Sequence, residues 1–504
     1  METLWVVDFG SQYSLLIVRR ARELGVYAEL LPWNRLPDSL PSHVKGLILS
    51  GSHASVSEGP PLPTHWLGAR PILAICYSAQ WVAARRGGAV EESFAREYGP
   101  AEVEVCEPDS PLWKGLPLQS RVWMSHGDTI TALPKGARLT ARTQTIPFAA
   151  YDIPEEQLYA VQFHPEVVHT EQGKAILRNF LRDICGFTEN WRPEDEIEQL
   201  TSSLREQMPT GEAICALSGG IDSTVAALLV HKAIGERFHG FFVDTGLLRA
   251  GEREEVLSAY KAVGLPVQVI EGEAAFYQAL KGVTDPETKR KRIGHLFIEL
   301  FEKEAARLPH VHYLVQGTIY PDVVESGTGV AATIKSHHNV GGLPKHLSLS
   351  LIEPLRLFFK DEVRALGKRL GLPPHFLERH PFPGPGLAVR ILGEVTPERV
   401  SRLRKADQIF IETLRKSQWY THTWQAFAVL LPQRAVGVGG DQRSYGEVIV
   451  LRAVDSTDGM TASPTPLPHE VLSEAAKRIL AEVPDIGRVV YDISTKPPAT
   501  IEWE

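Results

Sequence analysis

Residues 213–230 run without a break from an apolar stretch through a glycine-containing turn into a second apolar stretch. Residues 213–217, Ala-Ile-Cys-Ala-Leu, have the length and composition of a buried strand, and residues 225–230, Val-Ala-Ala-Leu-Leu-Val, fit the first turns of a helix. A loop that leads from a strand straight into a helix is a building unit of layered α/β domains. The sequence therefore predicts an α/β fold around this junction.

The loop between the two stretches, residues 218–224, offers groups that suit a phosphate. Backbone N–H groups and the positive end of the helix dipole point at one small volume, and the glycines let the main chain approach an anion closely. An aspartate disfavours a bare phosphate, so we expect Asp222 to cap the helix, to hold Mg²⁺ or to hold a lysine. The predicted ATP-binding residues of the loop are Ser218, Gly219, Gly220, Ile221, Asp222, Ser223 and Thr224.

This loop is not the P-loop G-x-x-x-x-G-K-[ST], because it is shorter and lacks the lysine. An ordinary glycine-rich turn is the alternative, and the strand before it and the helix after it argue against that alternative. The pattern Ser-Gly-Gly-Ile-Asp-Ser-Thr resembles the PP-loop of the N-type ATP pyrophosphatases. This resemblance implies that ATP adenylylates a substrate oxygen, that pyrophosphate is released, and that a nucleophile then displaces AMP.

Length and composition narrow the remaining possibilities. A chain of 504 residues is expected to form about two to four domains, and 43% hydrophobic with 23% charged residues is typical of soluble globular proteins. The net charge of −8 argues against a dedicated nucleic-acid binder, and no apolar stretch reaches the roughly 18 residues of a membrane span. Four scattered cysteines indicate neither a zinc site nor a disulfide framework. We therefore expect a cytoplasmic protein without nucleic-acid or membrane partners.

Alternating apolar runs and helical patterns divide the chain into three expected domains. Residues 1–188 and 189–379 each predict a doubly wound α/β domain with a mainly parallel sheet. The stretch 380–386, His-Pro-Phe-Pro-Gly-Pro-Gly, cannot form regular structure because its prolines fix φ and lack a donor. It marks the start of the third expected domain, residues 380–504, which predict a smaller α+β domain.

A candidate nucleophile lies in the first domain. Cys76 follows the apolar run 72–75 on a strand-to-helix turn, which exposes the sulfur and lets the helix N-terminus stabilise its thiolate. His164 can act as its base, and Glu166 can orient the imidazole. A lone cysteine at a strand end is more often a packing residue, but the following His-x-Glu pattern favours the catalytic alternative. Cys76, His164 and Glu166 are the predicted catalytic residues.

Longer motifs in this domain resemble the class I, or triad, glutamine amidotransferases. They are Asp-Phe-Gly-Ser-Gln-Tyr at 8–13, Leu-Ser-Gly at 49–51, Met-Ser-His-Gly-Asp at 124–128 and Gln-Phe-His-Pro-Glu at 162–166. With the PP-loop and the ending Lys-Pro-Pro-Ala-Thr-Ile-Glu-Trp-Glu at 496–504, the whole chain resembles the glutamine-hydrolysing GMP synthase family. This resemblance implies oxyanion-hole donors at Gly51 and Tyr77, and a homodimer formed through the C-terminal domain.

Four positions depart from the patterns of the family. Ala74 and Ser78 replace the glycines of its G-x-C-x-G elbow, and Ser52 and His53 replace the last two residues of its Ser-Gly-Gly-Pro loop. The added Cβ atoms could tilt Cys76 or crowd the glutamine pocket. A disturbed oxyanion hole costs about 10²–10³ in rate. We therefore expect a glutaminase that is weakened, retuned or strongly dependent on the partner domain.

Further strand ends of the second domain carry candidate nucleotide ligands, because doubly wound sheets bind ligands outside the carboxyl ends of their strands. The resemblance assigns Val243 and Asp244 to the adenosine of ATP. Asp322 and Glu325 suit Mg²⁺ beside phosphates, with a solvated pair of acids as the alternative.

Two cationic segments follow. Residues 335–344 are rich in cations and glycine and predict a mobile lid, whose Lys335 is assigned to ATP binding. Residues 360–364 are expected to begin an amphipathic helix. The resemblance places this helix near the pyrophosphate.

The resemblance places the XMP-binding elements mainly in the last domain. The rigid stretch 380–390 suits a base or ribose pocket, while Lys496 and Arg390 can supply charge for the substrate phosphate. From the residues alone, the same stretch could equally be an interface or a packing corner. The predicted substrate-binding residues are Arg249, Pro383, Gly384, Asp441, Lys496, Ile501 and Glu502.

The resemblance implies one overall reaction with glutamine, XMP and ATP as substrates and Mg²⁺ as cofactor. Glutamine hydrolysis supplies ammonia, ATP adenylylates O2 of XMP, and ammonia displaces AMP to give GMP. One alternative is another amide-forming PP-loop enzyme, such as a glutamine-dependent NAD synthetase, which the class I motifs and the C-terminal tail disfavour. The other is a regulatory nucleotide-binding protein that has lost glutamine chemistry, which the altered elbow motivates and the complete triad opposes.

Overall fold

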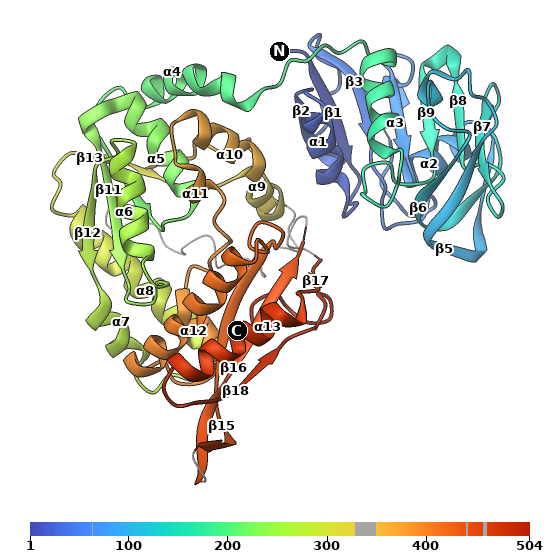
Figure 1. The fold of residues 1–504 in the computed structure, drawn as a ribbon. Coiled ribbons are helices and arrows are strands. Elements are labelled where there is room, and N and C mark those ends of the chain that lie inside the picture. The colour runs from blue at the N-terminus through green and yellow to red at the C-terminus, as the bar shows by residue number, and fades with distance from the viewer. Residues whose placement is uncertain (63, 328–348, 440–441, 457–460) are drawn as a thin grey trace. The chain divides into compact units, whose positions relative to one another are not determined.

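The computed structural model describes residues 1–62, 64–327, 349–439, 442–456 and 461–504. The chain divides into two compact units, Met1–Arg192 and Pro193–Glu504 (Figure 1). The further division at residue 380 that we expect from the sequence stays a prediction.

The first unit is built on a nine-stranded sheet with the order β2-β1-β3-β4-β9-β8-β7-β5-β6. Its first five strands are parallel, and the remaining four are joined by antiparallel pairs. The parallel half follows the predicted α/β pattern, because its short apolar strands are buried on both faces. The strands are β1 (Thr3–Asp8), β2 (Ala28–Pro32), β3 (Val44–Leu49), β4 (Ile72–Ile75), β5 (Ala89–Val105), β6 (Gln119–Ala132), β7 (Arg138–Thr143), β8 (Ala150–Ile153) and β9 (Leu158–Val161).

Three α-helices accompany this sheet. They are α1 (Ser14–Glu23), α2 (Tyr77–Arg85) and α3 (Gly173–Asn179). Helices α1 and α3 contact each other and therefore cover the same face of the sheet. Helix α2 begins directly after β4 and so carries the candidate nucleophile at its start.

The second unit contains a five-stranded parallel sheet with the order β12-β11-β10-β13-β14. Its strands are β10 (Glu212–Leu217), β11 (Phe238–Asp244), β12 (Val267–Glu271), β13 (Val311–Val315) and β14 (Ser350–Ile352). The chain winds outward from β10 in one direction and then returns to β13 on its other side. This reversal is a topological switch point, where doubly wound sheets bind their ligands. The predicted doubly wound fold is confirmed.

Helices cover both faces of the second sheet. Helix α5 contacts α4 and α10, whereas Ile214 and Phe241 of the sheet share a core with Phe276 of α7 and Ile293 of α8. The helices are α4 (Ile197–Gln207), α5 (Ile221–Ile234), α6 (Glu252–Ala262), α7 (Glu273–Leu280), α8 (Pro286–Ala305), α9 (Tyr320–Gly327), α10 (Lys360–Arg369) and α11 (Pro374–Leu377).

The C-terminal part of this unit packs two helices against a four-stranded sheet. Strand β16 is central: it pairs antiparallel with β15 and β17 and parallel with β18. The elements are α12 (Pro397–Lys416), β15 (Gln425–Gly439), β16 (Gln442–Asp455), β17 (Ser463–Pro464), α13 (His469–Glu482) and β18 (Ile486–Tyr491).

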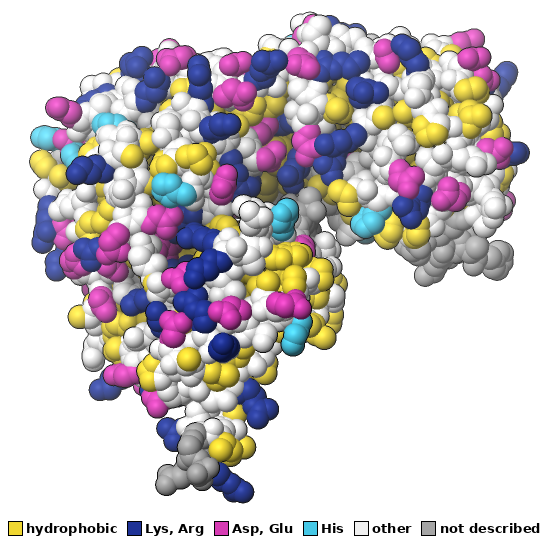
Figure 2. All heavy atoms as spheres, viewed as in Figure 1, with side chains coloured by type: hydrophobic (Ala, Val, Ile, Leu, Met, Phe, Trp, Pro, Cys, Tyr) yellow, Lys and Arg dark blue, Asp and Glu magenta, His cyan; other side chains and the backbone are white. Residues whose placement is uncertain are grey.

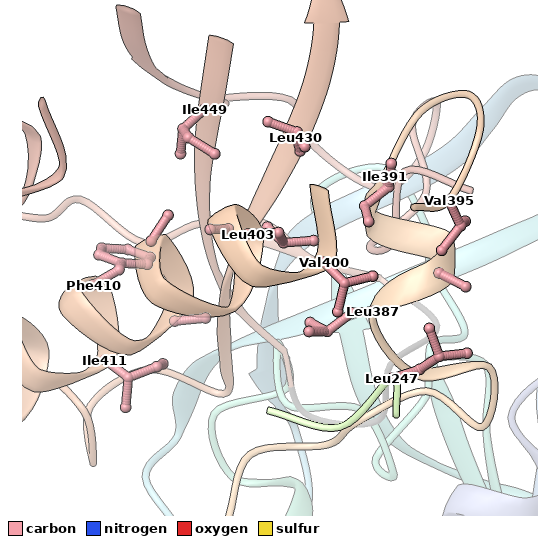
Figure 3. Packing of buried hydrophobic residues seen from close by; sticks show 14 of the residues in the cluster. Leu247, Leu387, Ile391, Val395, Val400, Leu403, Phe410, Ile411, Leu430 and Ile449 are labelled. Carbon is pink, nitrogen blue, oxygen red and sulfur yellow. The ribbon is translucent and has the colours of Figure 1, made fainter. Parts of the chain in front are cut away.

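One hydrophobic core runs through the second unit, from Ile214 on β10 to Ile486 on β18. Figure 3 shows Val400 and Leu403 of α12 packed between Leu430 of β15 and Leu387 of the proline-rich segment. Burial of this continuous apolar surface holds the C-terminal sheet to the five-stranded parallel sheet.

The connection between the two units is short. The N–H of Asn190 donates to the Gly25 carbonyl at 2.9 Å, and its side chain donates to the Glu2 carbonyl at 2.7 Å. Trp191 is buried in the first unit. A short 3₁₀ helix, Pro193–Glu196, already contacts α10 of the second unit. Arg192 alone separates residues held by one unit from residues held by the other.

Surface properties agree with the composition. On the face in Figure 2, Lys and Arg side chains alternate with Asp and Glu side chains on each unit rather than gathering by sign. None of the described helices combines the length and apolarity that a membrane crossing requires.

Candidate functional site

Cys76 lies at the point where β4 ends and α2 begins. Its backbone has φ 54° and ψ −109°, a conformation that side-chain-bearing residues rarely adopt. The N–H of Cys76 donates to the Val161 carbonyl at 2.8 Å, which ties the turn to β9. Such a sharp strand-to-helix turn places the sulfur at the helix N-terminus. The expected exposure of the sulfur is wrong, because Cys76 is buried under the loop after β3 and beside His164.

His164 and Glu166 follow β9 and form a buried pair. His164 Nδ1 lies 2.8 Å from Glu166 Oε1, and the two side chains are 3% and 0% exposed. Arg20 of α1 donates to the Glu166 carbonyl at 3.0 Å, and Thr170 donates to the His164 carbonyl at 2.6 Å. With Nδ1 bound to the carboxylate, Nε2 of the imidazole is left for proton exchange with the cysteine.

The electrostatics of this pair favour a protonated imidazole. Burial alone would lower the pKa of His164, but the Glu166 carboxylate and the interaction with Cys76 outweigh burial and hold the pKa of His164 well above its usual value. A protonated imidazole beside a cysteine is the arrangement of Cys–His nucleophile pairs. The pair is therefore arranged for attack by the Cys76 sulfur.

The predicted oxyanion donors lie next to this pair. A Cβ built on Gly51 would lie 3.6 Å from Cys76 Cβ and 3.4 Å from His164 Cε1, so the loop after β3 closes over the nucleophile. No acceptor in the described part of the chain takes the N–H of Gly51 or of Tyr77. Free N–H groups beside a nucleophile can donate hydrogen bonds to the oxygen of a tetrahedral intermediate.

The four positions that depart from the family patterns all fit into the structure. Ala74 is fully buried in β4 and Ser78 is fully buried in α2. The Ser78 hydroxyl donates to the Ser50 carbonyl at 2.5 Å. Ser52 Oγ accepts the N–H of Ala54 at 3.2 Å, and His53 Nδ1 lies 3.3 Å from the Gly10 carbonyl.

Two neighbours of His164 received no individual role from the sequence, although both belong to the motifs of the first unit. The Tyr13 ring packs edge-on against the imidazole, with centroids 4.9 Å apart. His126 is buried, and burial, together with the charge on His164, lowers the pKa of His126. Only the three-dimensional arrangement brings these rings to His164, because both residues are distant from it in sequence.

A second site lies at the switch point, in the loop after β10. Gly219 has φ +76°, and the Thr224 hydroxyl donates to the Gly220 carbonyl at 2.8 Å, which closes the turn. The N–H groups of Ile221, Asp222 and Ser223 form the first turn of α5 and meet no acceptor among the described residues. These are the groups that a helix N-terminus presents to an anion.

The loop after β13 packs directly against this turn. A Cβ built on Gly317 would lie 2.7 Å from Ser223 N and 2.8 Å from the Asp222 carbonyl carbon. Only a glycine lets the two loops approach this closely. No role for Gly317 is predicted from the sequence, since the need for a glycine there arises from a neighbour almost one hundred residues away.

Asp222 forms an ion pair with Lys360, the first residue of α10. This ion pair agrees with one of the alternatives considered for Asp222, the holding of a lysine, and it places α10 beside the loop. The other carboxylate oxygen, Oδ1, is buried without a partner among the described residues. A carboxylate oxygen of this kind, together with phosphate oxygens, suits Mg²⁺.

The loop after β11 is ordered by its own carboxylate. Asp244 accepts the Gly246 N–H at 3.0 Å and pairs with Arg253 at 2.6 Å. Arg249 is turned away from this loop, where it pairs with Asp407 at 3.2 Å and lies over the Phe382 ring.

The predicted substrate residues of the C-terminal part gather around Arg452 and Arg390. Arg452 donates to the Ile501 carbonyl at 2.8 Å. Glu502 pairs with Arg390 at 2.7 Å and accepts from Gln425 at 2.8 Å. The backbone of Lys496 pairs with Ala462, while Pro383 and Gly384 belong to an accessible turn before the 3₁₀ helix Gly386–Arg390.

The comparisons with known proteins agree across the whole chain. Residues 5–184 match the family model of class I glutamine amidotransferases, and residues 412–503 match the GMP synthase C-terminal domain. A glutamine-hydrolysing GMP synthase from Carboxydothermus hydrogenoformans is 53% identical over 504 residues, which is 99% of each chain. Those from Aquifex aeolicus and Cytophaga hutchinsonii are 50% identical over 99% and 49% identical over 100% of each chain.

The chain belongs to the glutamine-hydrolysing GMP synthase family.

Membership in the GMP synthase family explains why two unrelated kinds of site occur in one chain, but one expectation needs correction. Arg390 is fully buried between the Phe382 and Phe427 rings and paired with Glu502, so its charge is not available to a substrate phosphate. The cause is the long-range pairing with the tail, which the sequence could not reveal.

Some expectations fall on parts of the GMP synthase-like chain that the structure does not describe. Lys335 and the rest of the expected lid lie outside the described residues, as does Asp441. The Glu325 side chain is likewise not described. These assignments stay predictions.

Proposed function

We propose that this chain makes GMP from XMP, cleaving ATP to AMP and pyrophosphate and taking ammonia from glutamine. It is a ligase of the GMP synthase family, and purine nucleotide biosynthesis is its place in metabolism. The observation that carries the proposal is the coexistence, in one chain, of the Cys76–His164–Glu166 arrangement and a phosphate-binding helix N-terminus at the switch point of the second sheet.

Glutamine hydrolysis follows from the geometry of the first unit. The Cys76 thiolate attacks the side-chain amide carbon of glutamine, and the oxyanion is held by the N–H groups of Gly51 and Tyr77. His164, protonated and oriented by Glu166, gives its proton to the departing ammonia. Water then cleaves the γ-glutamyl thioester to release glutamate and restore the thiol.

Adenylylation takes place in the second unit. The loop residues 218–224 hold the phosphates of ATP, and Val243 with Asp244 borders the adenosine. O2 of XMP attacks the α-phosphorus, and pyrophosphate leaves. Ammonia then adds to the activated carbon and AMP leaves, which gives GMP.

The remaining assignments complete the synthetase site. Asp222 would hold Mg²⁺, which supplies positive charge to the phosphates of ATP. Lys335 is assigned to ATP. Arg249, Pro383, Gly384, Asp441, Lys496, Ile501 and Glu502 are assigned to XMP, in part by shaping its pocket, as the ion pair of Glu502 with Arg390 suggests.

The cell compartment and the assembly state are part of the proposal. We place the enzyme in the cytoplasm, where its nucleotide substrates are found, as a homodimer. Exposed apolar side chains on the hairpin of β15 and β16, Val436, Val438 and Tyr445, support a dimer surface there. In sedimentation equilibrium, Val438→Glu should yield monomer where the unchanged chain yields dimer; a monomeric unchanged chain would contradict this part of the proposal.

The decisive experiment compares two nitrogen donors. The unchanged chain should form GMP from XMP and ATP with glutamine or with ammonium, and release one AMP and one pyrophosphate for each GMP. Cys76→Ala should lose the glutamine-dependent reaction and keep the ammonium-dependent one. Release of ADP instead of AMP would contradict the proposal, and failure with both donors would favour the regulatory nucleotide-binding alternative.

A further inference from the structure

A buried hydroxyl connects the nucleophile elbow to the loop that covers it. Ser78, on the first turn of α2, donates to the Ser50 carbonyl at 2.5 Å. Both residues are fully buried. The hydrogen bond spans 28 residues of sequence, from the helix that follows Cys76 to the end of β3.

The acceptor of this hydrogen bond belongs to a functionally placed peptide. The Ser50 carbonyl and the Gly51 N–H are parts of one planar peptide group, so fixing the carbonyl fixes the direction of the N–H. The Ser50 side chain adds two restraints, because its Oγ accepts the Phe9 N–H at 3.0 Å and donates to the Gly51 carbonyl at 2.9 Å. Gly51 itself lies against Cys76 and His164.

The other departures in this loop show why such an anchor is needed. A proline fixes its own φ and restricts the residue before it, and His53 stands where the family pattern has that proline. Ser52, with a side chain, stands where the pattern has a glycine. The loop after β3 therefore lacks the proline ring that restricts its backbone. The turn at Cys76 has gained the Ser78 hydroxyl, which donates a hydrogen bond to this loop. A glycine at position 78 could not supply this hydrogen bond.

We infer that Ser78 is a positioning residue for glutamine hydrolysis, acting through the Ser50 carbonyl to aim the Gly51 N–H at the oxyanion. The inference rests on the proposed glutaminase activity. It gives Ser78 a specific role in place of the expected disturbance by an added Cβ: in this chain the serine is required, and the family's own glycine is harmful here.

The test uses Ser78→Ala and Ser78→Gly in the full-length chain, with Ser110→Ala as the matched control. Ser110 is also fully buried and donates to a carboxylate, Asp152, at 2.6 Å, but it belongs to no predicted site. Both Ser78 variants should lower kcat for glutamate release about 10- to 100-fold, with KM for glutamine within about twofold. Ser110→Ala should keep kcat, and all three variants should keep ammonium-dependent GMP synthesis.

A second readout separates aiming of the oxyanion donor from collapse of the elbow. Iodoacetamide alkylates a thiolate by displacing iodide, and no oxyanion forms in that step. Its rate at Cys76, followed by peptide mass because Cys106 is exposed, and the pH dependence of that rate should be unchanged in Ser78→Ala. Ser78→Cys, which retains a weak donor, should recover part of kcat.

Two results would overturn the inference: a Ser78→Gly variant with at least half of the original kcat, or alkylation that slows as much as glutamine turnover. A different result would instead count against the glutaminase activity itself. That result is glutamate release by the unchanged chain at no more than the rate of Cys76→Ala.

Discussion

Cys76 shows how a single residue is set up by groups that are distant in sequence. Its unusual φ is held by a hydrogen bond to β9, its base comes from the segment after β9, and its candidate oxyanion donor comes from the loop after β3. Backbone strain at a reactive residue persists because the surrounding structure determines it from several sides. The catalytic power assigned to Cys76 therefore depends on partners that can be altered one at a time.

Replacing Glu166 should change the pH dependence of glutamine hydrolysis. Burial on its own lowers the pKa of His164, and Glu166 is the largest influence that raises it. In Glu166→Gln the pKa of His164 falls, so the imidazolium that protonates ammonia is lost at a lower pH than in the unchanged enzyme. We expect kcat/KM for glutamine to fall about 10²-fold and the alkaline limb of its pH profile to move to lower pH.

The control for this prediction is Glu171→Gln. Glu171 lies five residues further on, is largely exposed and pairs with Arg121 at the surface. Its replacement should leave both the rate and the alkaline limb in place. An alkaline limb that does not move in Glu166→Gln would show that the carboxylate does not set the protonation of His164.

At the scale of elements, the second site depends on loops that meet at the switch point. The loop after β10 supplies the free N–H groups, the loop after β13 packs against it, and α10 brings Lys360 to Asp222. Each loop comes from a different strand, and their common position follows from the strand order. A change in one loop therefore acts on the others.

Gly317→Ala tests this dependence. The new Cβ would meet the backbone at Ser223 N, at 2.7 Å, where no flexible side chain can move aside. The loop has to shift, and we expect GMP synthesis to fall at least about 10²-fold with glutamine and with ammonium alike. Glutamate release by the first unit should persist.

Gly294→Ala provides the comparison. Gly294 lies within α8, and a Cβ there would meet nothing within 4 Å. This change should leave activity intact and stabilise the helix by about 0.5–1 kcal/mol. Full activity in Gly317→Ala, measured as AMP release, would mean that the two loops do not need their close approach.

The sequence predicted well whatever depends on short segments. The strand and helix around residues 213–230 lie where the apolar runs placed them, and the triad follows from a turn and a His-x-Glu pattern. The antiparallel half of the first sheet was not predicted, because the alternation of apolar runs and helical patterns was interpreted as a mainly parallel sheet, whereas β7, β8 and β9 pair antiparallel with their neighbours in sequence. Arg390 was misassigned for a different reason: its partner Glu502 lies 112 residues away.

At the scale of the whole molecule, the two units are joined through Arg192, with Trp191 held by one and Pro193 by the other. Ammonia made in the first unit has to be used in the second. A short tether keeps the local concentration of one site high at the other, and lengthening it lowers that concentration. The length of the connector is therefore expected to affect how much of the released ammonia is used for GMP synthesis. It is not expected to affect glutamine hydrolysis or ammonium-dependent GMP synthesis measured separately.

Insertion of ten Gly and Ser residues after Arg192 tests this expectation. Glutamate release and ammonium-dependent GMP synthesis should each stay within about twofold of the unchanged enzyme, because neither site is altered. The number of GMP molecules formed per glutamate released should fall. The comparison is a ten-residue Gly-Ser addition at Met1, which should leave that ratio unchanged; an equal ratio in both proteins would show that ammonia reaches the second site without a fixed tether.

The continuous core of the second unit also affects how the protein folds during translation. The first unit is complete once Arg192 has been made, so it can fold while the ribosome is still working. The second unit cannot complete its core until Ile486 has emerged near the end of translation. Until then, the nascent chain exposes apolar surface that the C-terminal elements cover in the finished protein, and exposed apolar surface of this kind is what chaperones bind.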